Sequence, residues 1–208
     1  MPSVGDNQVH ELRRELLSRA AEALGPAAAE VVEHACDLAE RAHHGQVRDE
    51  GTPYVTHPFR VALMLARDLE AIAGDPELMR TVEPCDILVI ALLHDVVEDA
   101  PAVASTPEWQ ALAEPIRSGV QLLTRESALT KQQYYDRLSR APEHIRLVKL
   151  ADRIDNLSGI ARSPVPGKRE RKVAETLSLV LPLAEAPASP VLEAYAGRLR
   201  SLTEGLTP

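Results

Sequence analysis

Aromatic residues and cysteines are scarce in this chain, and each scarcity limits the kinds of fold that the chain can form. Aromatics make up only 3% of the 208 residues, so the core must be built from leucine, valine, isoleucine and alanine. The two cysteines, Cys36 and Cys85, are far apart and lack ligand-like spacing, so we expect two reduced, buried thiols. A composition rich in alanine, leucine, glutamate and arginine, interrupted by 16 prolines, predicts an all-α fold of short helices.

The chain also lacks a long hydrophobic segment and an excess of positive charge. Its longest apolar run is the seven residues from Ile87 to Leu93 and its N-terminus is polar, so we expect no signal peptide, no membrane contact and a cytoplasmic protein. A net charge of −8 argues against a partner that is a polymeric nucleic acid. We find no inter-domain linker and expect a single domain over residues 1–208; the sequence does not specify an oligomeric state.

The most informative segment is an apolar run that ends in the polar residues His94, Asp95, Glu98 and Asp99. We expect one helix from about Pro84 to Asp99, in which spacings of three and four residues put these groups on one side. Three carboxylates and an imidazole among so many apolar neighbours would be costly to desolvate without a compensating cation. A divalent metal ion is the simplest such cation.

Two further segments supply candidate metal ligands. His57 lies where a loop enters a helix that Thr56 can cap. Asp152 interrupts the apolar stripe of a helix predicted over 142–157, so its carboxylate needs a partner. Two imidazoles and two carboxylates suit a first-row divalent ion such as manganese, iron or zinc better than calcium. The candidate ligands are therefore His57, His94, Asp95 and Asp152.

Glu98 and Asp99 lie one turn beyond His94 and Asp95. A divalent ion lowers the pKa of water toward neutrality, which makes hydroxide available to attack phosphorus. We expect Glu98 and Asp99 to orient that water or pass a proton to the leaving oxygen. The alternative is that they are ordinary exposed carboxylates near a helix C-terminus, where the helix dipole disfavours negative charge.

Four segments together resemble the signatures of HD-domain phosphohydrolases, and more specifically the hydrolase domain of RelA/SpoT proteins. They are AHHGQVRDEGTPYVTHP (42–58), ALLHDVVED (91–99), VKLADRIDNL (148–157) and ETLSLVLPLA (175–184). The resemblance covers about residues 35–185, and we expect extra helices on both sides of this region. The whole chain resembles a free-standing small alarmone hydrolase. The resemblance implies a compact multi-helix bundle with a central metal site.

This resemblance also implies an activity and a role for each matching residue. Such relatives use manganese to remove the 3′-pyrophosphate of guanosine tetra- and pentaphosphate, so it implies a hydrolase whose partner is a small nucleotide. By position, His57, His94, Asp95 and Asp152 would hold Mn²⁺ or another first-row ion, and the catalytic pair would be Glu98 with Asp99. Arg48 would pack on the base, and Asn156 would contact the sugar.

Two departures from the family pattern bear on the substrate. Asp49 replaces the usual lysine, and the cations available to compensate are Lys131, Lys172 and Arg171. Gly159 lies in a segment that reads Leu-Ser-Gly-Ile rather than Met-Arg-Thr-Leu. Guanosine and adenosine alarmones both stay open as substrates. The alternatives are another HD-type nucleotide phosphatase and a module that senses nucleotide without turnover.

Overall fold

The computed structural model describes residues 4–160, 163–185 and 188–206, and these residues form a helical protein. Within these ranges there is no β-strand, and extended pairing is limited to a bridge between Val47 and Pro53. The prediction of an all-α fold is confirmed. Across the same ranges, no helix has both the length and the apolar character needed to cross a membrane.

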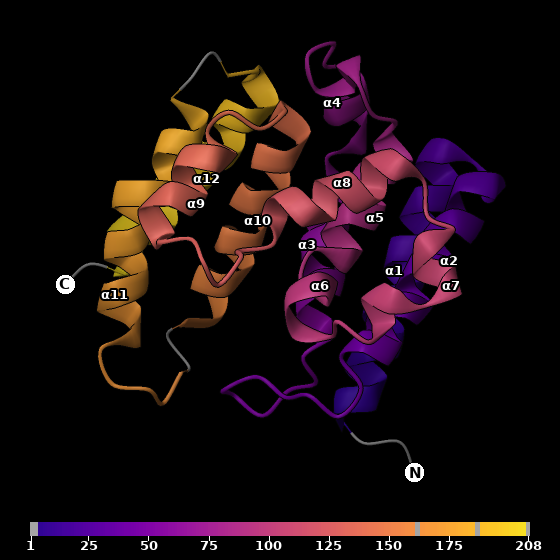
Figure 1. Cartoon of the computed structure of the whole chain (residues 1–208), viewed down its shortest axis with the longest axis horizontal. Coiled ribbons are helices and arrows are strands. Elements are labelled where there is room, and N and C mark those ends of the chain that lie inside the picture. The colour runs from indigo at the N-terminus through magenta and orange to yellow at the C-terminus, as the bar shows by residue number, and fades with distance from the viewer. Residues whose placement is uncertain (1–3, 161–162, 186–187, 207–208) are drawn as a thin grey trace.

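Twelve α-helices are distributed along the described residues, and Figure 1 shows α10 between α1–α8 and the last two helices. The first six are α1 (Val4–Leu24), α2 (Pro26–Ala42), α3 (Thr56–Arg67), α4 (Leu69–Ala73), α5 (Pro84–Leu93) and α6 (Val96–Asp99). The others are α7 (Pro107–Gln110), α8 (Glu114–Leu123), α9 (Lys131–Leu138), α10 (Glu143–Ile160), α11 (Lys168–Glu175) and α12 (Pro190–Leu206). Shorter turns are η1 (Leu78–Arg80), η2 (Val103–Ser105), η3 (Thr176–Val180) and η4 (Leu181–Ala184).

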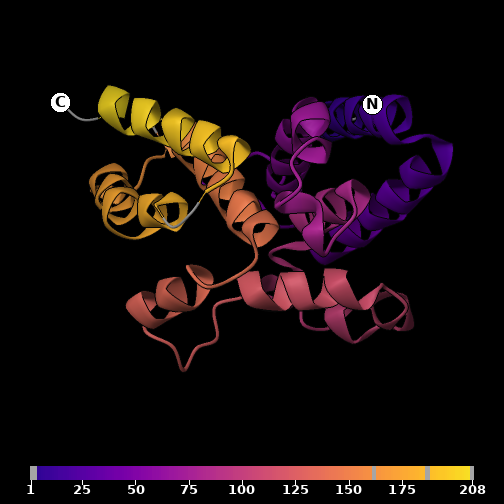
Figure 2. The same cartoon turned by 90° about the horizontal axis from the view of Figure 1, so that it is seen from above.

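Helix α10 packs against helices from both halves of the chain. It contacts α3 and α5 on one side and α12 on another, and Figure 2 shows it crossing between these groups. Of its 18 residues, 14 are buried, among them Asp152, Arg153 and Asp155. Charged side chains are rarely buried unless they are paired, so this helix must bring ionic partners together inside the protein.

A single hydrophobic cluster runs through the described helices, from Leu16 of α1 to Leu199 of α12. Both of these leucines are fully buried, so the first and last helices contribute to the same core as α10. Cys36 is buried as expected, but Cys85 is only half-buried, and its Sγ donates to the carbonyl of Ala28 at 3.6 Å. Burial raises the pKa of Cys36 to about 12, which keeps its thiol protonated.

The prediction of one continuous helix from Pro84 to Asp99 was wrong. Helix α5 ends at Leu93, and α6 resumes at Val96, so His94 and Asp95 occupy a turn between them. The beginning was predicted correctly: Pro84 follows the N-cap Glu83.

Three other helix boundaries also differ from the prediction. Thr56 is the first residue of α3 rather than its cap, because its hydroxyl donates to the carbonyl of Pro53 at 2.8 Å. The helix expected over 107–124 is divided into α7 and α8. The helix expected from Lys168 to Leu183 changes to a π-helical turn and then a 3₁₀ turn around Pro182, which has no N–H to donate.

Candidate functional site

The turn between α5 and α6 places His94 and Asp95 at the same point. Consecutive side chains of a regular helix diverge by about 100°, so two adjacent residues would not ordinarily reach one centre. Here His94 Nε2 lies 3.2 Å from Asp95 Oδ2. The interruption of the helix therefore lets both residues act at one site, which the predicted continuous helix did not explain.

His57, in the first turn of α3, and Asp152, in the middle of α10, complete this group. His57 Nε2 lies 3.2 Å from Asp152 Oδ1 and 3.8 Å from Asp95 Oδ2. His94 Nε2 lies 3.8 Å from the same Asp152 oxygen. Neighbouring ligands around a first-row ion with bonds of about 2.1 Å are about 3 Å apart, so these separations are close to those of a metal site. Three of the four candidates, His57, His94 and Asp95, thus have ligand atoms within 4.8 Å of one another, and Asp152 Oδ1 lies beside both imidazoles.

The hydrogen bonds of His94 test whether this group fits a cation. His94 Nδ1 lies 2.8 Å from the carbonyl of Ala91, so Nδ1 donates there and Nε2 is the ring nitrogen directed toward the other candidate ligands. This buried Nε2 has no hydrogen-bond partner among the described residues, and it faces oxygens of Asp95 and Asp152 that cannot donate. Burial lowers the pKa of His94, but Asp95 and Asp152 together raise it to about 9. The site therefore favours a positive charge, which a metal ion would supply.

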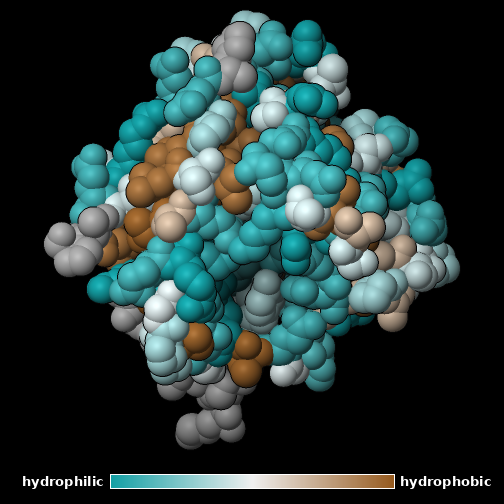
Figure 3. Space-filling model, turned by 60° about the vertical axis from the view of Figure 1, so that its left-hand side comes forward, coloured by the Kyte–Doolittle hydropathy of each residue, from teal (hydrophilic) through white to brown (hydrophobic). Residues whose placement is uncertain are grey.

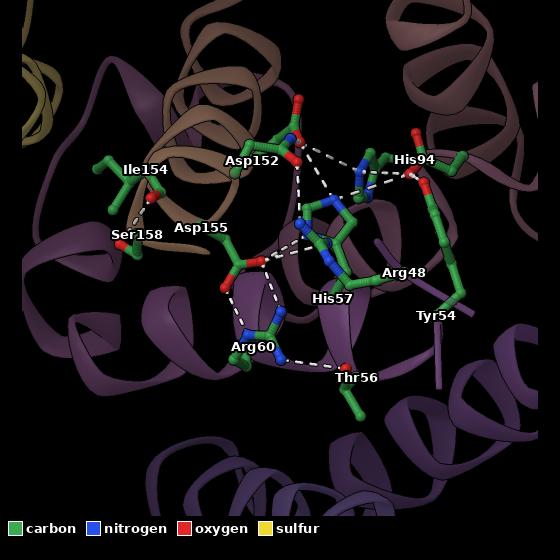
Figure 4. A network of polar contacts seen from close by, with 12 residues as sticks. Arg48, Tyr54, Thr56, His57, Arg60, His94, Asp152, Ile154, Asp155 and Ser158 are labelled. Carbon is green, nitrogen blue, oxygen red and sulfur yellow. Dashed lines mark hydrogen bonds and ion pairs between the residues drawn. The ribbon is translucent and has the colours of Figure 1, made fainter. Parts of the chain in front are cut away.

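A second layer of contacts orients His57. Its Nδ1 lies 2.7 Å from Asp155 Oδ2, and Arg60 donates to both Asp155 oxygens at 2.6 and 2.9 Å (Figure 4). Burial raises the pKa of Asp155, but its bonds to His57 and Arg60 lower it to about 2. The ionised carboxylate keeps the proton of His57 on Nδ1 and directs Nε2 toward Asp152. The sequence analysis missed Asp155 and Arg60, which each stand three residues after a predicted ligand.

The two candidate carboxylate ligands, Asp95 and Asp152, also have partners that the sequence analysis missed. The hydroxyl of Tyr54 donates to Asp95 Oδ2 at 2.8 Å, and Lys149 Nζ lies 2.7 Å from Asp152 Oδ2. Burial raises the pKa of Asp152, but the charge of Lys149 and the contact with His57 hold it well below its usual range. Lys149 stands three residues before Asp152, a helical spacing that was the available signal.

Glu98 and Asp99 are both exposed at the end of α6, but they face different surroundings. Glu98 lines the cleft beside the candidate metal ligands and accepts a hydrogen bond from the backbone N–H of Arg125 at 3.2 Å. Asp99 lies near Tyr54 and His43. Partial desolvation and then repulsion from Asp95 raise the pKa of Asp99. Glu98 and Asp99, which the sequence analysis treated as one pair, therefore lie in different surroundings.

A mostly polar cleft of about 300 Å³ opens beside the candidate metal ligands, and the space-filling view shows a hollow bordered by hydrophilic residues (Figure 3). Asn156 and Lys131, two predicted substrate contacts, line this cleft. The third, Arg48, lies at its edge and donates to Asn156 Oδ1 at 3.3 Å. Four cationic side chains of α9, α10 and α11 also line it: Lys131, Lys149, Arg153 and Lys172.

Asp49, the departure noted in the sequence, is neutralised by a nearby cation. Its carboxylate pairs with Lys168 at the start of α11 and accepts a hydrogen bond from Ser163 Oγ at 2.7 Å. Of the cations named to compensate for Asp49, Lys131 and Lys172 line the cleft. Arg171 does not; its guanidinium bonds to the carbonyl of Pro166 at 3.2 Å.

Comparisons of this chain with known proteins find similar proteins by sequence and a similar fold by structure. A model of the HD domain family matches residues 35–187. The human guanosine-3′,5′-bis(diphosphate) 3′-pyrophosphohydrolase MESH1 is 32% identical over 189 residues, which covers 88% of this chain and 94% of that protein. The bifunctional (p)ppGpp synthase/hydrolase SpoT of Escherichia coli (strain K12) is 35% identical over 160 residues, or 71% of this chain.

The chain spans about a fifth of the length of the first curated relatives that it matches. Among solved structures, that of a metazoan ortholog of SpoT, described as one that hydrolyses ppGpp, superposes with a TM-score of 0.60 at 23% identity. That alignment covers 85% of this chain and 97% of the other. The likeness supports the same arrangement of helices.

Proposed function

Because this chain belongs to the HD domain family, we propose that it is a metal-dependent pyrophosphohydrolase that removes the 3′-pyrophosphate of guanosine or adenosine alarmones. The printed names of the human and E. coli relatives assign hydrolysis of guanosine alarmones to those proteins. The observation that carries the proposal for this chain is that Nε2 of His57 and Nε2 of His94 each lie 3.2 to 3.8 Å from an oxygen of both Asp95 and Asp152, beside a polar cleft.

We propose that the resident ion is manganese, with another first-row divalent ion as the alternative. Its ligands would be His57, His94, Asp95 and Asp152. Imidazole nitrogen and carboxylate oxygen are donors that such ions accept, and the unpartnered Nε2 of His94 supports a cation there. When bound, the ion would make water a stronger nucleophile toward phosphorus by lowering its pKa.

Glu98 and Asp99 are proposed to divide the proton transfers between them. Glu98 lies on the wall of the cleft, where its carboxylate can orient the attacking water. The raised pKa of Asp99 favours the protonated form that can donate to the leaving oxygen. The two side chains would therefore act as base and acid respectively.

Arg48, Asn156 and Lys131 are proposed to hold the nucleotide. The planar guanidinium of Arg48 can stack on a base, and its bond to Asn156 fixes its position at the cleft edge. Asn156 also donates to Asp152 Oδ1, so a sugar bound by Asn156 would lie next to the metal ligands. Lys131, from α9, supplies a cation for phosphate in the same cleft.

We further propose that residues 1–208 fold as a single HD hydrolase domain, since α1 and α12 share one core with the matching region. The unpaired thiols of Cys36 and Cys85 support placement in the cytoplasm. A net charge of −8 favours a small nucleotide over a polymeric nucleic acid as partner.

A nucleotide hydrolysis panel tests the proposal. Purified protein loaded with Mn²⁺ should release pyrophosphate from guanosine or adenosine nucleotides that carry a 3′-pyrophosphate, as separated by anion-exchange chromatography. Asp152→Asn, which removes one ligand, serves as the background control. If metal is bound but neither class of alarmone is turned over, the proposal is wrong.

A second candidate function is that of another HD-type nucleotide phosphatase. It is favoured by Asp49, which stands where the family usually has a lysine and whose partner Lys168 is already paired with it. The same panel separates the two candidates by product. Inorganic phosphate in place of pyrophosphate would favour the phosphatase. Tight nucleotide binding without any product would instead indicate a nucleotide-sensing module.

A further inference from the structure

Glu175, the last residue of α11, sits among cations of three different helices. Its Oε1 lies 2.5 Å from the guanidinium of Arg153, and its Oε2 lies 2.5 Å from Nζ of Lys131. Lys172 Nζ lies 4.0 Å from Oε1, and Tyr135 contributes a hydroxyl at 3.4 Å. All these residues line the cleft beside the metal ligands. Neither the family resemblance nor the proposed metal chemistry assigns Glu175 a role.

One carboxylate does not balance this cluster. Three cations face Glu175, so these four side chains carry a net charge of +2, which Asp152 offsets only in part because it is paired with Lys149. Arg153 is only 3% exposed, and its Nε and Nη1 have no hydrogen-bond partner among the described residues. Burial, followed by repulsion from Arg153, lowers the pKa of Lys172. An added anion would both satisfy unpartnered buried donors and reduce the repulsion between neighbouring positive charges.

The shape of the cluster indicates which anion it would accept. One carboxylate oxygen of Glu175 pairs with Arg153 and the other pairs with Lys131. A phosphate group can bind an arginine and a lysine in the same way, through two of its oxygens. A phosphate carries more negative charge than a carboxylate and has an additional oxygen for the third cation. A phosphate group in the place of the Glu175 carboxylate would therefore match the cluster better than Glu175 does.

The cluster also lies next to the proposed reaction centre. Arg153 directly follows the proposed ligand Asp152 in α10. Lys149, which pairs with Asp152 at 2.7 Å, stands one helical turn before Arg153. Residues four apart on a helix are neighbours about 5–6 Å apart, so the cluster and the metal ligands can contact a single bound nucleotide.

We propose that Arg153, Lys131 and Lys172 form a second anion subsite for a phosphate or pyrophosphate group, and that Glu175 occupies it as a built-in competitor. The identity of the ligand as a nucleotide rests on the proposed function, whereas the subsite itself rests on the contacts of Glu175. In the empty cleft, Glu175 neutralises part of the positive charge. On binding, the incoming group displaces the carboxylate, and Glu175 thereby weakens the binding of anions.

The test is the affinity of the full chain, loaded with one equivalent of Mn²⁺, for inorganic pyrophosphate by titration calorimetry. Glu175→Gln keeps the size and one acceptor oxygen of the side chain but removes its charge. We expect this variant to bind pyrophosphate at least tenfold more tightly than the unmodified chain. Glu170→Gln, which alters an exposed carboxylate of the same helix paired with Arg169, is the matched control and should change the affinity less than twofold.

Lys131→Gln gives an independent test, because Lys131 is exposed on α9 and its replacement leaves the core intact. It should weaken pyrophosphate binding at least fivefold, whereas Arg169→Gln, outside the cluster, should not. Thermal unfolding of each variant confirms that it is folded. If Glu175→Gln binds pyrophosphate no more tightly than the unmodified chain, or if Lys131→Gln binds it as well, the subsite is refuted.

Nucleotides identify which phosphate group enters the subsite. The ratio of kcat/KM between Glu175→Gln and the unmodified chain is compared for guanosine 3′-pyrophosphates with a 5′-hydroxyl and with a 5′-diphosphate. An increase for both substrates assigns the subsite to the 3′-pyrophosphate, and an increase confined to the second assigns it to the 5′ end. Pyrophosphate binding requires no turnover, so failure of the proposed function would leave the binding result interpretable.

Discussion

Replacing Asp155 by asparagine tests whether the second layer around His57 tunes the metal site. Asp155 accepts from His57 Nδ1 at 2.7 Å and holds Arg60 through both oxygens, but it is not itself a candidate ligand. The amide of Asp155→Asn has a single acceptor oxygen and no charge. His57 would then lose the carboxylate that fixes its tautomer and strengthens Nε2 as a donor to metal.

The expected magnitude follows from these contacts. Loss of such a partner typically lowers metal affinity 10- to 100-fold, which corresponds to about 1.4 to 2.7 kcal/mol. Stability should also fall, because Arg60 loses its ion pair and Arg48, 3.6 Å from Asp155, loses a nearby negative charge. Arg60 remains partly exposed, so we expect a loss of about 2 kcal/mol, between the values for surface and buried ion pairs.

Affinity for Mn²⁺ is measured by competition with a chelator, and stability by urea unfolding of the metal-free chain. Asp68→Asn is the matched control, because Asp68 also holds an arginine, Arg198, through both oxygens and contacts none of the candidate ligands. This control should lose stability but keep its affinity for Mn²⁺. If Asp155→Asn binds Mn²⁺ as tightly as the unmodified chain, the orienting role of Asp155 is refuted.

Three further predictions concern the ligands, their support and the buried histidine of α10. Asp95→Asn should abolish Mn²⁺ binding, whereas Glu98→Gln should keep the metal and lose about 100-fold in initial rate; an unchanged rate would contradict the role of Glu98. Tyr54→Phe removes the hydrogen bond to Asp95 and should cost about 1 kcal/mol in urea unfolding, with weaker Mn²⁺ binding in the same chelator assay. Burial lowers the pKa of His144 from 6.5 to about 4. As pH falls from 6.5 to 4, His144 is therefore protonated in the unfolded state before it is protonated in the folded state, which favours unfolding. The free energy of unfolding should therefore fall by up to about 3 kcal/mol between these pH values, and His144→Gln should remove that part of the pH dependence in urea titrations.

The candidate metal ligands could be selected from the sequence because each is a polar residue in a local apolar pattern, and the structure places their side chains close together. The interruption between α5 and α6 could not be predicted, since the residues from Cys85 to Asp99 contain neither glycine nor proline to signal a break. Asp95 in that turn is held by Tyr54, which lies 41 positions earlier in the chain. A contact of that separation contributes nothing to a local pattern, so tertiary structure decides where the helix ends.

The same limit explains why the supporting residues were missed. Asp155 orients His57 from 98 positions away, and Glu175 meets Lys131 from 44 positions away. Sequence spacing predicts which residues share a face of one helix, but not which faces of two helices meet. The cleft cations therefore became recognisable as a cluster only when α9, α10 and α11 were placed together.

The ion pair of Asp49 changes where we expect the phosphate groups of a nucleotide to bind. The sequence predicted that an anion at this position would weaken nucleotide binding unless Lys131, Lys172 or Arg171 replaced the missing lysine. In the structure Asp49 pairs with Lys168, so this pair carries no net charge beside Arg48. The uncompensated positive charge lies instead around Arg153, on the side of the cleft that α9 and α11 form. A nucleotide bound here would therefore gain most from phosphate groups that reach Arg153, and least from groups placed near Asp49.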